Sequence, residues 1–160
     1  WLNLPFLPVP AFLSRTQIGK ASGAQIKDWL EQELHNVFAQ NAMERFGGWM
    51  VRFSGMTVKF NAHAKKGNRV QEIIVGGEPI LDSKLYTMSA CRREGEDLDM
   101  LCRMPNTVET RVMDYTIHDA LAEYLKHKGT VAPKKDGRSV ALDLGDNVLS
   151  QLPGTNYHFH

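Results

Sequence analysis

The chain has 160 residues, of which 42% are hydrophobic and 23% are charged, so it is long enough to bury a core and has the composition of a globular protein. Its formal net charge of +1 excludes the strong electrostatic field that attracts nucleic acid. No run of about eighteen apolar residues marks a membrane span. We therefore expect neither nucleic acid nor a bilayer among its partners.

The start of the chain differs from a secretory signal peptide. Residues 1–6 contain no Met, no basic segment and no cleavage site. We interpret them as the inside of a longer protein. Three prolines within residues 4–10 predict an extended or irregular stretch.

The first clear element is a helix over residues 23–40, after a weaker strand candidate at residues 12–20. Ser22 and Gln25 have the spacing of a capping box, in which each side chain bonds the backbone of the other residue. Apolar residues then recur at helical spacing, so this face of the helix is predicted to lie in the core. These residues are Ile26, Trp29, Leu30, Leu34, Val37 and Phe38.

Several strands are predicted after this helix. Met56, Val58 and Phe60 alternate with polar residues, a period that is typical of a half-buried strand. Gly76 and Gly77 predict the turn between the two arms of a hairpin. The strand candidates are residues 49–53, 56–60, 69–75, 78–81 and 84–90.

A charged stretch and a second helix complete the chain. Residues 92–103 have no regular period and are predicted to form a loop. A helix is expected over residues 116–128, because apolar residues line one face and Gly129 has the position of a C-cap glycine. A last short strand is expected at residues 139–142. The apolar face consists of Ile117, Ala120, Leu121, Tyr124 and Leu125.

The order of these elements predicts the fold class. Hairpins without regular crossover helices indicate a mixed or antiparallel sheet with helices packed on it. We therefore predict an α+β fold and not a doubly wound parallel sheet.

The sequence offers no catalytic residue and no metal ligand. The six histidines and two cysteines have none of the spacings of metal sites, and no GxSxG, GxGxxG or Walker A motif is present. Cys91 and Cys102 are eleven residues apart. A disulfide between them and two separate thiols are both compatible with the sequence.

Two segments are candidates for ligand binding. Arg92 and Arg93 directly follow a predicted strand, and two arginines can hold an oxyanion through paired hydrogen bonds. The alternative is a solvated run of charges that pair with one another. Residues 46–53 combine aromatic side chains with glycines, which suits a stacking platform for a ring. The alternative there is that Trp49 or Phe53 packs in the core.

The ordered set of motifs resembles the C-terminal domain of the 5'-nucleotidase and bifunctional metallophosphoesterase (2',3'-cyclic phosphodiesterase) superfamily. The resemblance covers residues 4–143 in the family's order. Residues 22–31 are similar to the family's helix motif tGaqlkewLE, residues 48–61 to gflqvSGl, residues 67–86 to a pattern beginning G.rV, and residues 119–138 to a pattern ending dGR.

The resemblance implies a fold, a partner and an activity. It implies a four-layer α/β/β/α domain, here a single domain over residues 1–160, that recognises the substrate of a two-domain metal-dependent hydrolase of phosphate esters. The implied substrates are nucleotides, which implies a role in nucleotide catabolism. The implied partner is an N-terminal metallophosphoesterase domain, absent from this chain, that holds two divalent metals. We therefore expect the chain to be inactive alone, and the full protein to be exported to the periplasm or cell surface.

The resemblance also places a substrate pocket on particular residues. In the family two aromatic rings hold the base. Their positions correspond here to Met50, with Trp49 beside it, and to Cys91. Asp97 has the position that bonds a ribose hydroxyl. Stacking contributes about 1–3 kcal/mol per base, so the replacement of both rings weakens the expectation of a standard nucleotide pocket.

Three further expectations complete the sequence analysis. Arg92 and Arg93 favour an anionic substrate or a contact with the other domain. The loss of both rings suits a small anion or a protein-bound group as the substrate, as in the thiosulfohydrolase branch of the same superfamily. A non-catalytic binding module that keeps the fold is a second alternative. An unpaired sheet edge is expected to allow a dimer of this chain.

Overall fold

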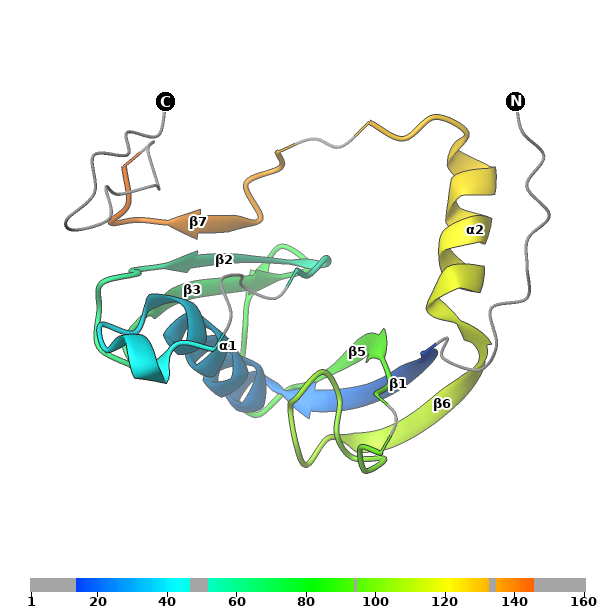
Figure 1. The fold of residues 1–160 in the computed structure, drawn as a ribbon, viewed down its shortest axis with the longest axis horizontal. Helices are drawn as coiled ribbons and strands as arrows, with labels where there is room; N and C mark the ends of the chain where they lie inside the picture. Colours follow the sequence, from blue (N-terminus) through cyan, green and yellow to red (C-terminus); the bar gives the residue numbers. More distant parts are fainter. Residues whose placement is uncertain (1–13, 47–51, 94, 133–134, 146–160) are drawn as a thin grey trace. The chain divides into compact units, whose positions relative to one another are not determined.

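The computed structural model describes residues 14–46, 52–93, 95–132 and 135–145 (Figure 1). The chain divides into two compact units, and each is described by itself. The first unit comprises Trp1–Gln25 and Ser83–Lys134, and the second comprises Ile26–Asp82 and Lys135–His160. The strand expected at residues 49–53 lies partly outside the described residues, and Arg52 and Phe53, which are described, are not in a strand.

The first unit contains a three-stranded antiparallel sheet. β1 (Arg15–Ser22) is its central strand, with β5 (Leu85–Cys91) on one side and β6 (Val108–Thr116) on the other. β1 and β5 pair without interruption, so that Gln17 faces Ala90 and Gly19 faces Met88. The expected strands at residues 12–20 and 84–90 are thus confirmed with shifted ends.

β6 has no counterpart among the predicted strands. Charged residues interrupt its apolar ones, and its pairing with β1 shifts register twice. A Cβ on Gly19 would lie 2.8 Å from Cγ2 of Thr110 in β6, which is closer than two carbon atoms approach each other. With Thr110 opposite, glycine at position 19 therefore avoids a steric clash between β1 and β6. An irregular strand of this kind has no clear period for sequence reasoning to detect.

α2 (Ile117–Lys128) follows β6 directly and confirms the expected second helix. Thr116 caps it, because the Thr116 hydroxyl accepts from the Asp119 backbone N–H while the Asp119 carboxylate accepts from the Thr116 N–H. Gly129 ends the helix by donating to the Leu125 carbonyl. No residue of α2 is buried, so its apolar face is exposed within the described part of the chain.

The second unit contains a four-stranded mixed sheet in the order β4–β3–β2–β7. β2 runs antiparallel to β3 and parallel to β7. Gly76 and Gly77, with φ of 62° and 89°, form the predicted hairpin turn between β3 and β4. The strands are β2 (Met56–Phe60), β3 (Val70–Val75), β4 (Glu78–Pro79) and β7 (Ser139–Ala141).

α1 (Gly23–Phe38) begins in the first unit and runs for most of its length in the second. Its predicted capping box is confirmed, with Ser22 N–H donating to Gln25 at 2.9 Å and Gln25 N–H donating to Ser22 Oγ at 3.2 Å. In the second unit α1 lies beside β2 and β3 (Figure 1), and the Phe38 and Phe60 rings are 5.7 Å apart. The predicted apolar stripe is buried at Ile26, Trp29, Leu30 and Leu34.

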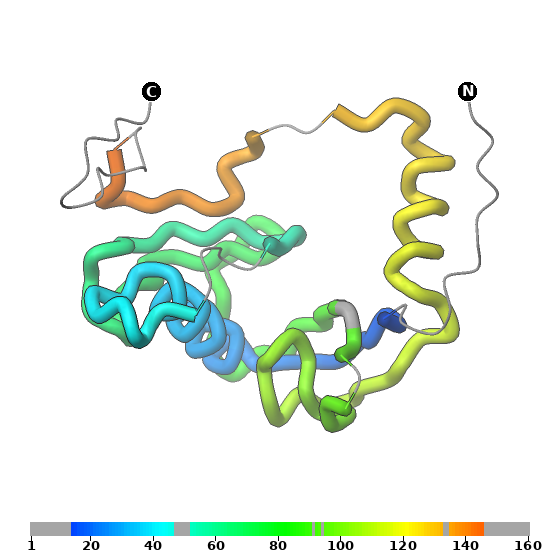
Figure 2. The backbone as a smooth tube through the Cα atoms, in the orientation of Figure 1, coloured from blue at the N-terminus to red at the C-terminus, as the bar shows by residue number. Residues whose placement is uncertain are grey.

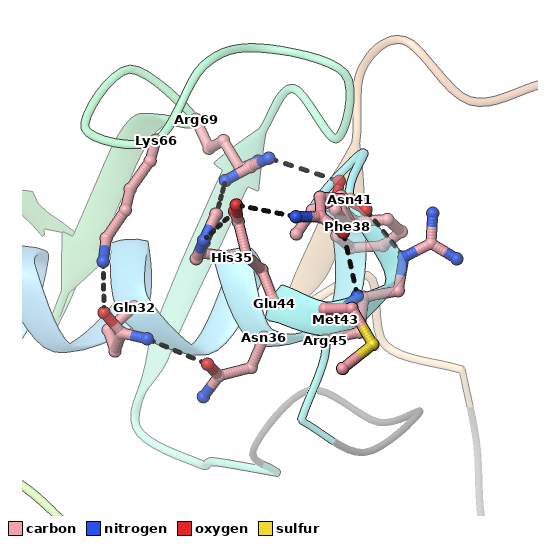
Figure 3. A network of polar contacts seen from close by, with 11 residues as sticks. Gln32, His35, Asn36, Phe38, Asn41, Met43, Glu44, Arg45, Lys66 and Arg69 are labelled. Atoms are coloured by element: carbon pink, nitrogen blue, oxygen red, sulfur yellow. Dashed lines mark hydrogen bonds and ion pairs between the residues drawn. The ribbon is translucent and has the colours of Figure 1, made fainter.

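The buried Arg69 contacts the end of α1, and through His35 it also positions the segment that follows α1 (Figure 3). Arg69 is 3% exposed, and its guanidinium lies 3.2 Å from His35 Nδ1 and from the Phe38 carbonyl oxygen. Because arginine only donates, Nδ1 of His35 accepts, which leaves Nε2 to donate to Glu44 at 3.1 Å. The short 3-10 helix η1 (Ala42–Glu44) is therefore held against α1.

β7 is attached by side chains beyond both of its ends. Before it, Arg138 pairs with Asp136 and donates to the Phe53 carbonyl at 2.7 Å. After it, the Asp143 carboxylate accepts from the backbone N–H groups of Ala62 and His63 at 2.7 and 2.8 Å. Two helices with one antiparallel and one mixed sheet confirm the α+β class.

Candidate functional site

The site residues predicted from the sequence fall on two parts of the chain. Trp49 and Met50 lie outside the described residues, as does the side chain of Cys91, whose backbone ends β5. Arg92, Arg93 and Asp97 lie in the first unit, in the loop of residues 92–107 between β5 and β6. This loop, called the 92–107 loop below, is the part of the candidate site that the structure describes.

Residues 95–107 of this loop form a series of tight turns, as the backbone trace in Figure 2 shows. Met100 N–H donates to the Asp97 carbonyl at 3.1 Å, and Leu101 and Met104 exchange two backbone hydrogen bonds of 2.9 Å. The residues between them, Cys102 and Arg103, have φ of 50° and 67°, a region that non-glycine residues seldom adopt. The predicted loop is confirmed, and several backbone hydrogen bonds hold the residues after Gly95.

Arg92 is fixed at both its backbone and its guanidinium. Its N–H donates to the Arg15 carbonyl at 2.8 Å, which continues the β1–β5 pairing by one residue, and Nη2 donates to the Glu96 carbonyl at 3.2 Å. Nε of Arg92 is buried and has no acceptor among the described residues. A buried cationic donor without a partner is costly, and an anion is the partner that offsets this cost best.

Arg93 and Asp97 are more exposed than Arg92. Arg93 lies 3.9 Å from the Glu96 carboxylate, and its side chain is 59% exposed. The charged run therefore pairs partly within itself, as one of the two sequence readings expects. Asp97 is exposed on the surface of the loop, where its carboxylate can accept hydrogen bonds from a ligand.

Three residues outside the predicted site hold the loop in place. Gln17 Nε2 donates to the carbonyls of Leu98 and Met100, at 2.6 and 3.3 Å. Gln25 Nε2 donates to the carbonyls of residues 105 and 106, and Thr107 donates to the Asp99 carbonyl through both N–H and Oγ1. The capping box reveals Gln25 in the sequence, but nothing local signals its second role or that of Gln17, since both act on residues about eighty positions away.

Cys102 is half-buried. Within the described residues, no group of three or more His, Cys, Asp or Glu side chains is placed to hold a metal ion. Neither described helix has the length and apolar character that crossing a bilayer requires.

The second unit carries exposed apolar side chains just before the predicted ring position. Met43 is 91% exposed and Phe46 is 70% exposed. Both lie on the segment that Arg69 and His35 hold against α1, and Phe46 N–H donates to the Asn36 carbonyl at 2.9 Å. Large apolar side chains on a firmly held segment are typical of contact surfaces.

The chain was compared with known families and structures. Residues 7–97 match the family described as 5'-nucleotidase, C-terminal domain. The chain is similar to the sulfate thiohydrolase SoxB of Thermus thermophilus in complex with glycerol, with a TM-score of 0.63 and 25% identity over 83% of this chain and 23% of that one. It is also similar to a 5'-nucleotidase precursor from Thermus thermophilus, with a TM-score of 0.65 and 17% identity over 84% of this chain and 26% of that one. Curated protein sequences gave no significant match.

The fold and the candidate site together define an α+β domain. In this domain a loop that carries arginine and aspartate side chains follows a strand. The chain belongs to the 5'-nucleotidase C-terminal domain family, because the match covers more than half of its residues. The resemblance found in the sequence is thus confirmed. The chain spans about a quarter of the length of the two similar structures.

Proposed function

We propose that this chain is the substrate-recognition domain of a two-domain metal-dependent hydrolase, and that Arg92 binds the anionic group of the substrate. The observation that carries the proposal is the half-buried Arg92 directly after β5, whose Nε has no acceptor among the described residues. Its backbone is held by Arg15 and its Nη2 by the Glu96 carbonyl. A guanidinium held in this way loses little freedom when it binds an oxyanion, which favours affinity.

The hydrolase class rests on the family and on the two similar proteins, whose names describe a thiohydrolase and a nucleotidase. The proposed second domain supplies two divalent metals that activate water. The described residues of this chain do not fit such ions, since none of their side chains cluster as ligands. This chain's own contribution is to bind and orient the substrate.

Two substrate classes fit this site. A nucleotide would place its phosphate on Arg92 and a ribose hydroxyl on Asp97, whose carboxylate is exposed. A small sulfur or phosphorus oxyanion, free or attached to a protein, would need only the arginine. We favour the small oxyanion, because a cysteine stands where the family's second stacking ring would be and the name of one similar protein describes a thiohydrolase.

Calorimetric titration of the 160-residue chain tests this function. Inorganic phosphate, thiosulfate, adenosine and AMP are the ligands, and Arg92→Ala is the test variant. Arg111→Ala is the matched control, since Arg111 is an exposed arginine of β6 in the same unit. We expect Arg92→Ala to weaken oxyanion binding by about tenfold or more, because charge-assisted hydrogen bonds are lost. Equal weakening in both arginine variants would contradict the proposal.

The ligand ranking separates the substrate classes. Thiosulfate or phosphate binding without adenosine binding supports the small oxyanion. Adenosine binding that is lost in Asp97→Ala supports the nucleotide instead. Binding of neither class by the wild-type chain would favour a non-catalytic module.

We also propose that the full protein is exported, as its similarity to a nucleotidase precursor suggests. Expression from the complete gene followed by osmotic-shock fractionation tests this. Recovery of the mature protein from the cytoplasm alone would contradict it.

A further inference from the structure

We propose that Gln17 is a positioning residue of the substrate site, which sets the place of Asp97 by holding the carbonyl groups that follow it in the 92–107 loop. This inference rests on the proposed function for its ligand, and its binding test applies to the nucleotide, the substrate class that would use Asp97. Gln17 is fully buried at the centre of β1. It lies about eighty residues before the loop in sequence.

The first observation is that each backbone carbonyl group from Asp97 to Met100 accepts a hydrogen bond. The carbonyl of Asp97 accepts from Met100 N–H, and that of Asp99 accepts twice from Thr107. The carbonyls of Leu98 and Met100 both accept from the single side-chain amide of Gln17. Four successive carbonyl groups are therefore fixed, and Gln17 supplies the bonds to two of them. The exposed Asp97 carboxylate is thus carried by a backbone that has little freedom.

The second observation is that Gln17 is not satisfied by this arrangement. Because its Nε2 faces the two carbonyls, its Oε1 points the other way, and Oε1 is buried without a donor among the described residues. A methionine has a similar shape and no polar atom to bury. If residue 17 only filled this space, the protein would be more stable with methionine there. The amide of Gln17 is therefore explained better by its hydrogen bonds to the loop.

The third observation is the shared sheet face of Gln17 and Arg92. Gln17 faces Ala90 across the β1–β5 pair, and Arg92 is two residues beyond Ala90. The Arg92 N–H continues this pairing by bonding the Arg15 carbonyl, and side chains two residues apart on paired strands point to the same face. Gln17 and Arg92 are therefore diagonal neighbours across the β1–β5 pair. Gln17 is therefore the residue on β1 best placed to set the Asp97 segment in relation to Arg92.

The test compares Gln17→Met with Gln71→Met in the 160-residue chain. Gln71 is the matched control, because its Nε2 also donates to two backbone carbonyls, those of Asn68 and Arg69, but in the second unit. AMP and inorganic phosphate are titrated into each variant. We expect Gln17→Met to weaken AMP binding on the order of tenfold, since a misplaced carboxylate loses its hydrogen bond, and to change phosphate binding much less. Gln71→Met is expected to change neither.

A double-mutant cycle with Asp97→Asn separates positioning from general destabilisation. If Gln17 acts through Asp97, Gln17→Met has no further effect on AMP binding once Asp97 is replaced. An equal loss for both ligands, or the same loss in the Asp97→Asn background, would overturn the proposal.

A readout without ligand keeps this inference distinct from the proposed function. If the wild-type chain binds AMP no more tightly than phosphate, the ligand is the small oxyanion, and if it binds neither, the proposed function fails. In both cases amide exchange decides the role of Gln17. We expect Gln17→Met to speed exchange at Met100, whose N–H bonds the Asp97 carbonyl, while Thr107 keeps its protection. Unchanged exchange at Met100 would show that Gln17 does not position the Asp97 segment.

Discussion

The Glu31 carboxylate lies 2.6 Å from the backbone nitrogen of Val70, and its second oxygen lies 2.8 Å from that of Gly67. Glu31 is 5% exposed, so a charged residue of α1 is buried against the loop before β3. Two backbone N–H groups compensate the buried charge, which is the condition under which a carboxylate is tolerated in a core.

Glu31→Gln tests this bonding. The amide presents an N–H where the wild-type oxygen accepts, so one backbone N–H loses its partner. We expect a loss of about 1–3 kcal/mol in the free energy of unfolding, measured by denaturant titration. Glu72→Gln is the control, because the Glu72–Lys59 pair is exposed and such pairs contribute about 0–1 kcal/mol. Equal losses in the two variants would show that Glu31 is no more important than a surface charge.

Gly19→Ala tests the close approach of β1 and β6. The added methyl would lie 2.8 Å from Thr110 Cγ2, and relieving such overpacking costs about 1–3 kcal/mol. Thr110→Ser removes that methyl, so the double variant Gly19→Ala/Thr110→Ser should recover most of the lost stability. A double variant as unstable as Gly19→Ala would show that another contact is responsible.

Asp143 makes the attachment of β7 depend on pH. Desolvation raises the pKa of its carboxyl, but the backbone N–H groups of His63 and Ala62 outweigh this and hold the pKa below its ordinary value. The stabilisation is therefore fully present above the ordinary pKa and is lost as the pH falls through the lowered one. We expect the Ala62 and His63 amides to lose exchange protection on acidification below the ordinary carboxyl pKa. In Asp143→Asn their protection should already be reduced at neutral pH and should not change on acidification.

We also predict that the chain self-associates, and that the apolar face of α2 is the contact surface. Ile117, Leu121, Tyr124 and Leu125 are each between 40% and 55% exposed, and exposed apolar patches mark contact sites. We expect light scattering to show a dimer at high concentration that Leu121→Glu weakens. Lys126→Glu is the control on the same helix. A monomer at every concentration would remove the prediction.

Local signals explain which parts of this fold can be predicted from its sequence. The capping box of Ser22 and Gln25, the glycine pair at 76 and 77 and the alternation at Met56–Phe60 each specify an element through neighbouring residues, and each is confirmed. The irregular pairing of β6 with β1 comes from residues far apart in sequence, such as Gly19 and Thr110, and leaves no period to detect.

The site follows the same rule. Arg92 and Arg93 are candidates because they follow a predicted strand, and Asp97 is a candidate because of its position in a family motif. The residues that hold their loop, Gln17 and Thr107, act across long sequence distances or through backbone carbonyls that any residue provides. The apolar stripe of α1 predicts burial correctly, whereas that of α2 is exposed within the described chain.

The most direct test of the central claim is to observe the Arg92 Nε–H group by NMR while inorganic phosphate and then thiosulfate are added. If Arg92 Nε binds the anionic group, its resonance should shift and saturate with ligand, whereas the exposed Arg111 should show only the small, unsaturated change of a surface cation. An Arg92 resonance that stays in place, or that moves no more than that of Arg111, would contradict the assignment of Arg92 as the anion-binding residue.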